Sequence, residues 1–303
     1  MNRHLIITGA SGLVGSALAS TAHAAGYILW KAVRVPPSKL TEHTLFWDVA
    51  TGRIDLPPDS VNDQLFIVHL AGESIAAGRW TQEQKERIQN SRVDVTRKLS
   101  SYLASSHHRP DLFLSASAIG LYGDGGEEEL NEQSPAATDF LGKVCAQWEA
   151  AAGPLKKVNV PVAHLRFGLI LAPEGGALKQ MLPVFRLGLG GQLGDGQQWM
   201  SWITLKDAVA AILHIIEQKL SGSFNIVTEN PVRNCDFTTA LAAALHRPAI
   251  LPVPAFALRM LLGEMADGLL LRSQRVLPRS LAKAGFQPQH PKINQALPSI
   301  LPG

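Results

Sequence analysis

The sequence lacks the residue patterns that mark several common kinds of site. Cysteine is scarce, because only Cys145 and Cys235 occur among 303 residues and they lie far apart in the chain. Neither a disulfide framework nor a C-x-x-C metal or redox pair is therefore expected. Neither an H-E-x-x-H motif nor a cluster of histidine ligands is present, and His107 and His108 lie in what we interpret as a loop. We expect no metal site, and the absence of a G-x-S-x-G elbow argues against acyl transfer.

The chain also lacks a block of charge of one sign. Lysine and arginine total 28 against 25 acidic residues, and the formal net charge of +3 is spread along the sequence. This distribution argues against a nucleic-acid partner. The two most apolar stretches, 161–172 and 255–271, are interrupted by Arg166 and by Arg259 and Asp267. We interpret them as a buried strand and an amphipathic helix, and we expect no membrane partner.

The N-terminal residues show no secretory signal. A strand-like apolar run begins at His4 and leads directly into a glycine-rich loop, with no cleavage-site pattern. Together with the scarcity of cysteine, which favours a reducing compartment, this predicts a cytoplasmic protein.

What is present is an alternation of short β-rich runs and helical patterns, which is typical of βαβ units and a parallel sheet. The expected strands span 4–8, 28–33, 65–70, 112–117 and 162–169, and the expected helices span 13–25, 81–105 and 139–152. The pattern predicts an α/β fold, a Rossmann-type doubly wound parallel sheet with a small, mainly helical C-terminal region on the substrate side.

Three regions are expected along the chain. Residues 1–172 are predicted to form an NAD(P)-binding Rossmann core. Residues 173–246 begin with a glycine-rich segment that no single helix or strand could span, and they form a substrate-side segment interleaved with the core. Within it, T-L-K-D at 204–207 resembles a capping box that opens a helix. The Pro- and Leu-rich residues 247–303 are predicted to form a small helical domain.

The strongest motif is T-G-A-S-G-L-V-G, which lies directly between a predicted strand and a predicted helix. Gly9 permits the tight turn, Gly12 lets a pyrophosphate approach the backbone, and Gly15 lets helix and strand pack closely. The helix N-terminus offers free N–H groups to the phosphates, so the loop residues predicted to contact the dinucleotide are Gly9, Ser11, Gly12, Leu13, Val14 and Gly15. The alternative is a purely structural glycine turn.

The end of the second strand indicates which dinucleotide binds. An acidic residue there would bind the ribose 2′-hydroxyl of NAD, whereas this strand ends in Arg34, with no acid nearby, and a basic residue suits the 2′-phosphate of NADP. We therefore predict NADP(H), although Arg34 could also be a solvated surface residue. Leu70, Ala71 and Gly72 end a buried strand at the ligand edge and are predicted to lie beside the cofactor. His69 is interpreted as a hydrogen-bonded core histidine rather than a catalytic one.

The motifs in combination resemble a known family. H-L-A-G-E, R-W at 79–80, S-R at 91–92, S-A-S-A-I-G-L-Y-G, L-R-F-G-L-I-L, L-G-L-G-G-Q-L-G-D-G-Q and S-W-I follow the glycine loop in order. The chain thus resembles the YfcH-like "epimerase family protein" branch of the extended short-chain dehydrogenase/reductases, which carries a C-terminal domain of unknown function. The resemblance covers nearly the whole chain. It implies an NAD(P)-binding fold and places Arg92 and Ile170 near the dinucleotide; without it, Arg92 would be a solvated helix residue.

The chemistry is less well specified. Hydride-transferring relatives use a Ser, a Tyr and a Lys four residues after that Tyr, with the lysine lowering the tyrosine pKa. Ser117 matches the serine, but the helix expected to carry the pair reads D-F-L-G-K-V-C-A-Q-W-E and has no tyrosine, so Lys143 has no partner. Tyr122 is predicted at the ligand edge, either as the proton-transferring group or as a residue that lines the site.

Two functions remain open from the sequence. One is an NADP(H)-dependent oxidoreductase or epimerase whose small-molecule substrate is a small carbonyl or resembles a nucleotide sugar. The other is a non-catalytic NADP(H)-binding regulatory or interaction protein. Polar and aromatic residues of the glycine-rich segment either contact the substrate or only pack the segment onto the sheet, namely Gln197, Trp199, Ser201 and Trp202. The oligomeric state is not indicated.

Overall fold

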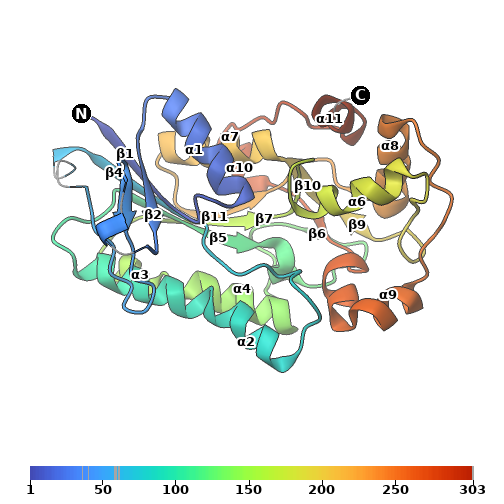
Figure 1. Ribbon diagram of the computed structural model, residues 1–303, viewed down its shortest axis with the longest axis horizontal. Coiled ribbons are helices and arrows are strands. Elements are labelled where there is room, and N and C mark those ends of the chain that lie inside the picture. Colours follow the sequence, from blue (N-terminus) through green and yellow to red (C-terminus); the bar gives the residue numbers. More distant parts are fainter. Residues whose placement is uncertain (36, 40, 58–59, 61, 302–303) are drawn as a thin grey trace.

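A computed structural model describes residues 1–35, 37–39, 41–57, 60 and 62–301. Within these residues the main sheet has seven strands, all parallel, in the order β11-β7-β5-β4-β1-β2-β3 (Figure 1). The strands are β1 (Arg3–Thr8), β2 (Ile28–Val33), β3 (Thr44–Phe46), β4 (Gln64–His69), β5 (Leu112–Ala118), β7 (Val162–Phe167) and β11 (Gly222–Ile226). The chain order reverses direction between β1 and β4, which is where doubly wound sheets bind their ligands. The predicted fold class is confirmed.

Helices cover both faces of this sheet, which explains why its central strands are apolar on both sides. Figure 1 shows α1 (Leu13–Ala24) and α7 (Leu205–Glu217) above the sheet, and α2 (Gln82–Asn90), α3 (Val93–Ser105) and α4 (Phe140–Ala150) below it. The short α5 (Gly153–Lys157) packs against α3. Two buried apolar clusters result, one between the sheet and α1 and α7, the other between the sheet and α3.

Side-chain caps fix where several helices begin. Thr81 accepts a hydrogen bond from the Gln84 backbone N–H before α2, and Asp139 accepts one from Gly142 before α4. The helix start predicted at 204–207 is present, because the Thr204 hydroxyl accepts a hydrogen bond from the Asp207 backbone N–H at 3.1 Å. The arrangement differs from a capping box, since the Asp207 carboxylate accepts from the Thr204 hydroxyl, at 2.8 Å, rather than from its backbone N–H. Each cap satisfies an N–H group that a helix start leaves unpaired.

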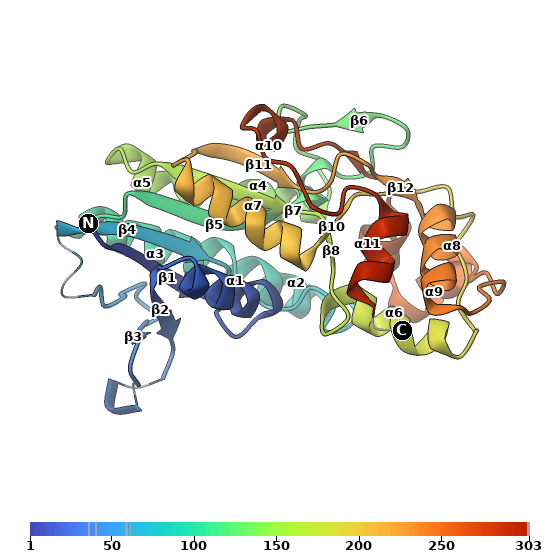
Figure 2. The ribbon, with the colours of Figure 1, turned by 90° about the horizontal axis from the view of Figure 1, so that it is seen from above.

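The later part of the chain builds a second, smaller body beside the carboxyl ends of the strands (Figure 2). Its helices are α6 (Gly176–Arg186), α8 (Asn234–Leu245), α9 (Ala255–Leu262) and α11 (Ile293–Ile300), with a π-helical turn at Ala266–Leu270. The short α10 (Arg279–Lys283) instead packs on the core sheet, against β11. Short strand pairs join distant segments: β8 (Leu169–Leu171) with β10 (Trp202–Thr204), β9 (Trp199–Met200) with β12 (Val232–Arg233), and β6 (Glu129–Leu130) with β13 (Arg275–Val276). A third buried cluster joins α6, α8 and α11.

Two elements that we expected to be continuous are each divided into two in the structure. The single helix expected over 81–105 is two helices, because the chain turns at Ser91 and Arg92 between α2 and α3. The strand expected over 162–169 breaks at Gly168, where a Cβ atom would lie 2.5 Å from the Val227 side chain and 2.6 Å from the Ser201 carbonyl oxygen. Only glycine fits there. Before this residue β7 pairs with β11, and after it β8 pairs with β10.

Among the described residues, no helix has both the length and the apolar character needed to cross a membrane. The same part of the chain contains no group of three or more His, Cys, Asp or Glu side chains placed to hold a metal ion.

Candidate functional site

The glycine loop has the geometry that its three glycines predict. Gly9 has a φ of 71°, and a Cβ atom on it would lie 2.9 Å from backbone atoms of Leu70 and Ala71. A Cβ atom on Gly15 would lie 2.2 Å from the Gly9 carbonyl oxygen. Both positions therefore exclude any side chain, Gly9 through backbone conformation and contact with the β4 end, and Gly15 through helix packing. Gly12 differs, because a Cβ atom there meets only the Gly9 carbonyl oxygen, at 3.3 Å, and the residue is exposed.

The N-terminus of α1 is left open to a ligand. Its N-cap is Gly12, which has no side chain to cap the helix, and the first turn contains no acidic residue. Within the described chain, the backbone N–H groups of Leu13, Val14 and Gly15 have no hydrogen-bond partner. Ser11 is exposed beside them. Unpaired N–H groups together with the positive end of the helix dipole suit an anionic group such as a pyrophosphate.

Arg34 lies directly after β2, next in the sheet to β1 and its glycine loop. The residue is exposed and makes no ion pair with any residue that the structure describes. Lys31, on the same strand, is also exposed. The end of β2 therefore presents positive charge to solvent at the position where a dinucleotide would carry its 2′-phosphate.

The loop after β4 brings Arg92 against Gly72. A Cβ atom on Gly72 would lie 3.5 Å from the Arg92 guanidinium carbon, and that guanidinium donates to the Glu73 carbonyl oxygen at 2.8 Å and lies over the Trp148 ring. Burial lowers the pKa of Arg92. Arg92 is thus packed between the loop and α4, and the solvated alternative is wrong for this side chain. Whether it contacts a dinucleotide stays a prediction.

Ile170 is the middle residue of β8, and its carbonyl oxygen lies 3.7 Å from a Cβ atom built on Gly176, at the start of α6. The neighbouring Gly175 would place a Cβ atom 2.8 Å from the Leu13 side chain. The fold therefore brings the glycine loop, β8 and α6 together at the carboxyl edge of the sheet. Leu13 and Ile170, both predicted to contact the cofactor, are therefore brought to the same edge although they lie far apart in the sequence.

His69 is a core residue, as expected. It is fully buried, its Nδ1 lies 2.7 Å from the Thr8 hydroxyl and its Nε2 lies 3.0 Å from the Thr96 hydroxyl. Burial lowers its pKa to about 4, so the ring is neutral at physiological pH. His69 ties β1, β4 and α3 together.

Ser117 is buried at the end of β5, and its hydroxyl donates to Glu149 at 2.8 Å. Glu149 forms a two-pronged ion pair with Arg166, with N–O distances of 2.8 and 2.9 Å. Burial raises the pKa of Glu149, but the hydrogen bonds and charge of Arg166 outweigh it, so the carboxyl pKa lies below its ordinary value. The serine is therefore held by an ionised carboxylate inside the protein.

Tyr122 belongs to the same network. Its hydroxyl accepts a hydrogen bond from Arg166 at 2.8 Å and donates one to the Asn225 side chain at 2.6 Å. Burial, only partly offset by Arg166, raises the pKa of Tyr122 to about 12. This geometry disfavours the proton-transfer role considered for Tyr122 and favours a structural one, because both the proton and a lone pair of its oxygen are engaged.

The face of α4 that meets the turn after β5 is apolar. Leu141 and Cys145 flank Gly120, with the Leu141 Cβ atom 3.6 Å and the Cys145 Sγ atom 3.9 Å from a Cβ atom built there. These residues have the four-residue spacing of the tyrosine and lysine of hydride-transferring relatives. Burial raises the pKa of the Cys145 thiol to about 12. Lys143 is exposed on another face of the helix.

Two of the residues singled out in the glycine-rich segment, Ser201 and Trp202, are packed inside the protein, whereas Trp199 is only partly buried. Trp202 is fully buried, and Ser201 donates to the Gln274 carbonyl oxygen at 2.8 Å. Guanidinium groups of Arg233 and Arg275 lie 4.5 and 4.9 Å from the centre of the Trp199 ring. The packing alternative therefore describes Ser201 and Trp202, while Trp199 also lines a pocket and Gln197 is exposed.

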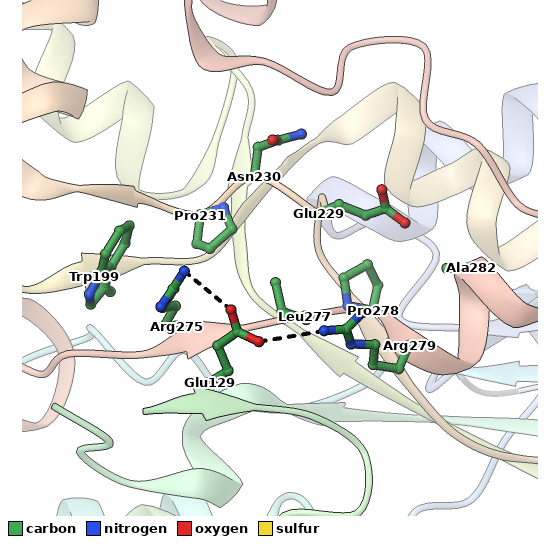
Figure 3. Close-up of a pocket in the computed structure, with 10 residues that line it drawn as sticks. All are labelled: Glu129, Trp199, Glu229, Asn230, Pro231, Arg275, Leu277, Pro278, Arg279 and Ala282. Atoms are coloured by element: carbon green, nitrogen blue, oxygen red, sulfur yellow. Dashed lines mark hydrogen bonds and ion pairs between the residues drawn. The ribbon is translucent and has the colours of Figure 1, made fainter. Parts of the chain in front are cut away.

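A pocket of about 400 Å³ lies beside Trp199, away from the glycine loop. Figure 3 shows Glu129 between Arg275 and Arg279, with Glu229 and Asn230 on the opposite wall. Leu277, which also lines this pocket, accepts a hydrogen bond from Asn225 at 2.9 Å. The buried network around Ser117 thus extends to the edge of this pocket.

Sequence reasoning missed most of this network. Glu149 and Asn225 carry no motif and lie far from Ser117 in the sequence. Arg166 offered a signal, because a charged residue within an otherwise apolar strand must be paired if it is buried.

Comparison with protein families identifies two matches along the chain. The model described as "NAD dependent epimerase/dehydratase family" matches residues 5–227, and a domain of unknown function, DUF1731, matches residues 253–300. These matches confirm the resemblance drawn from the motifs, including the C-terminal domain of unknown function.

Individual relatives agree with these matches. "Epimerase family protein ML0860" of Mycobacterium leprae is 39% identical over 292 residues, covering 96% of this chain and 93% of the relative. The crystal structure of human epimerase family protein SDR39U1 with NADPH superposes with a TM-score of 0.88 at 28% identity, covering 98% of both chains. A structure titled nucleoside-diphosphate sugar epimerase, from Corynebacterium glutamicum, is 33% identical with a TM-score of 0.76, covering 98% of this chain and 57% of that one.

Proposed function

We propose, from the premise that this chain belongs to the NAD-dependent epimerase/dehydratase family, that it is a cytoplasmic NADP(H)-binding oxidoreductase or epimerase-like protein. Its substrate in this proposal is a small carbonyl compound or a nucleotide-sugar-like molecule. The observation that carries the proposal is the open N-terminus of α1 above the glycine loop, with Arg34 exposed at the end of the next strand.

The residues present fit an NADP(H) molecule. Residues Ser11 to Gly15 would hold the pyrophosphate with backbone N–H groups, and Arg34 would pair with the 2′-phosphate. Leu70, Ala71 and Gly72 would lie along the dinucleotide, with Arg92 and Ile170 at its sides. When bound, the nicotinamide supplies or accepts a hydride. The human relative solved with NADPH supports this choice of cofactor.

Ser117 is the group of this chain that would orient a substrate oxygen. Its hydroxyl would have to exchange its hydrogen bond with Glu149 for one to the substrate. Tyr122 would hold Arg166 in place rather than move a proton. The apolar side chains of Leu141 and Cys145 would exclude water from the same edge of the sheet.

A titration of the purified protein tests the cofactor. Isothermal calorimetry with NADPH and NADH should show tighter binding of NADPH, and Arg34→Asp should remove most of that preference, because it replaces the 2′-phosphate partner with a like charge. Arg97→Asp, an exposed arginine on α3, is the matched control and should keep the preference. Failure of both nucleotides to bind would overturn the proposal.

A second candidate is a non-catalytic NADP(H)-binding regulator, favoured by the apolar pair on α4 and by the engaged hydroxyl of Tyr122. NADPH oxidation with a panel of small aldehydes, ketones and nucleotide sugars separates the two. Turnover that Ser117→Ala reduces at least about tenfold supports the enzyme. Tight NADPH binding with no turnover across the panel supports the regulator.

A further inference from the structure

The pocket beside Trp199 plays no part in the proposed function. Its walls come from β6, from β9, from the segment that joins β11 to β12, and from β13 with the residues that follow it (Figure 3). Its volume of about 400 Å³ lies at the lower end of the range of about 300–1,000 Å³ that is usual for small-molecule sites. The pocket therefore suits one small ligand.

This pocket lies on the side of β9 that faces away from the cofactor edge. Neighbouring side chains of a strand point to opposite faces. Met200 packs against the buried cluster of α6, α8 and α11, so Trp199, the residue before it in β9, points away from that cluster. The start of α6 meets the glycine loop through Gly175 and Leu13. A ligand in the pocket would therefore be separate from a bound dinucleotide.

Hydrogen bonds within the protein hold the wall that β13 and its following residues form. The Leu277 N–H donates to the Leu130 carbonyl oxygen at 2.8 Å, and the Leu277 carbonyl oxygen accepts from the Asn225 side chain at 2.9 Å. The Val276 N–H donates to the Ser201 hydroxyl at 2.8 Å. A pocket whose walls are already held in place loses little binding free energy to their ordering.

The charged side chains that line the pocket balance one another. Arg275 and Arg279 both pair with Glu129, at N–O distances of 3.2 and 3.4 Å, and Glu229 supplies a second carboxylate. Two positive and two negative groups leave no net charge. A phosphate or a nucleotide would have to lie close to two carboxylates, which disfavours it. The pocket therefore favours a ligand that carries no net charge.

The free donors and acceptors are nevertheless separated between two walls, which Figure 3 shows opposite each other. Glu229 is exposed and forms no ion pair with any residue that the structure describes. Asn230 donates its side-chain amide to the Pro291 carbonyl oxygen at 3.1 Å, which leaves its side-chain oxygen to accept. Arg279, on the other wall, is 66% exposed and donates to Glu129 through one nitrogen, so further N–H groups can donate. One wall thus suits a cationic donor and the other an anionic acceptor.

The rest of the lining is apolar. Pro231, Leu277, Pro278 and Ala282 contribute to it together with Trp199. A sugar ring would stack on the Trp199 indole, but arginine guanidinium groups already lie over this ring, 4.5 and 4.9 Å from its centre. The pocket therefore favours a charged-ended ligand with an apolar part over a neutral sugar.

We propose that this pocket binds a small zwitterion of the free amino-acid class. Its ammonium group lies against Glu229 and the Asn230 side-chain oxygen, and its carboxylate lies against Arg279. Both ends then form charge-assisted hydrogen bonds, and the apolar lining takes the side chain of the ligand. This site is additional to the dinucleotide and substrate sites of the proposed function.

Calorimetry of the full chain with each of the common free amino acids tests this proposal. At least one of them should bind at a single site. Glu229→Gln and Arg279→Gln should each weaken that binding about tenfold or more, because each removes the charge from a charge-assisted hydrogen bond. Glu217→Gln and Arg53→Gln change exposed residues of the same charge outside the pocket, and these matched controls should bind like the wild-type protein.

Blocked derivatives of the amino acid that binds test the two ends separately. The N-acetyl derivative lacks the ammonium group and the carboxamide lacks the carboxylate, so each should bind about tenfold or more weakly than the parent compound. A blocked derivative that binds as tightly as the parent would show that one of the two charged ends is not recognised, and the zwitterion would be the wrong ligand class.

Other outcomes would also overturn the proposal. One is that no amino acid binds at millimolar concentration, and another is that glucose, galactose or N-acetylglucosamine binds instead and Glu229→Gln weakens this binding. Amino-acid binding that survives both substitutions would place the site elsewhere. Both substituted side chains are exposed, so the variants should fold, and NADPH titration of them should match the wild-type protein. Failure of this proposal is thereby distinguished from failure of the proposed cofactor site.

Discussion

The three glycines of the cofactor loop differ in how far the structure excludes a side chain at each of them. A side chain at Gly9 or Gly15 would collide with backbone, whereas one at Gly12 would press only lightly on the Gly9 carbonyl oxygen. Gly12 is also the exposed residue at the open helix end. The fold therefore requires glycine at positions 9 and 15, whereas at position 12 the requirement that we predict is that of a ligand.

Substitution should reveal this difference. Gly12→Ala is expected to change the free energy of unfolding by no more than about 0.5 kcal/mol while weakening NADPH binding, because the added methyl group stands where the pyrophosphate approaches. Gly15→Ala is expected to destabilise the protein by about 1–3 kcal/mol through overpacking. Urea unfolding and calorimetry on both variants check this. Equal loss of stability in the two would contradict it.

Two buried histidines make stability depend on pH. Burial lowers the pKa of both His69 and His164 to about 4, below the ordinary value of about 6.5. The unfolded chain therefore binds more protons between pH 6.5 and 4, so stability is lost as the pH falls through this window. At pH 5 each histidine should cost about 2 kcal/mol relative to pH 7.5.

Urea unfolding at pH 7.5 and pH 5 measures this loss. His164→Leu should reduce the difference by roughly half, because His164 has no hydrogen-bond partner for either ring nitrogen within the described chain and can be replaced by an apolar residue. His23→Leu, an exposed histidine on α1, is the control and should leave the difference unchanged. If the free energy of unfolding were the same at pH 7.5 and pH 5, neither histidine would be held in its neutral form by burial.

At the scale of elements, most strands and helices of the Rossmann core could be predicted from the sequence, but the points where one strand and one helix are interrupted could not. Strands β1, β2 and β5 and helix α1 lie within a residue or so of their expected bounds, because their apolar runs are bounded by glycine or proline. The break at Gly168 depends on contact with Val227 and Ser201, which are distant in sequence, so no local pattern could reveal it.

The geometry of the glycine loop was predictable for a similar reason. A glycine loop and the residue ending the next strand are local features with a fixed geometric consequence. The network of Ser117, Glu149, Arg166 and Tyr122 is assembled from β5, α4, β7 and the turn after β5, so only the fold shows that the serine and tyrosine are engaged.

This assembly predicts how activity responds to pH, if substrates are found. Tyr122 and Cys145 have pKa values raised to about 12, and Glu149 is held ionised by Arg166, so none of them changes protonation between pH 6 and about 10. The kcat of NADPH oxidation should therefore be flat across this range. A bell-shaped profile that Tyr122→Phe removes would instead assign proton transfer to the tyrosine.

At the scale of the whole molecule, the C-terminal residues are not a detachable unit by their contacts. The division at 247 stays a prediction, and residues 302–303 of that region lie outside the described residues. Trp80 of the core packs against Gly268, where a Cβ atom would lie 2.6 Å from its ring. Asp207 of α7 accepts hydrogen bonds from the backbone N–H groups of Gln289 and His290 at 2.7 and 3.1 Å.

Removing residues 247–303 should therefore unfold the remainder rather than release an intact core. The deletion would expose the apolar cluster of α6 and α8, leave Asp207 buried without these two donors and remove the strand pairing of β6. Loss of a buried cluster and of paired polar groups exceeds the 5–15 kcal/mol by which a domain of this kind is stable. Circular dichroism and urea unfolding of residues 1–246 check this expectation. A cooperative transition at the wild-type midpoint would show instead that the core folds alone and that the C-terminal residues only dock onto it.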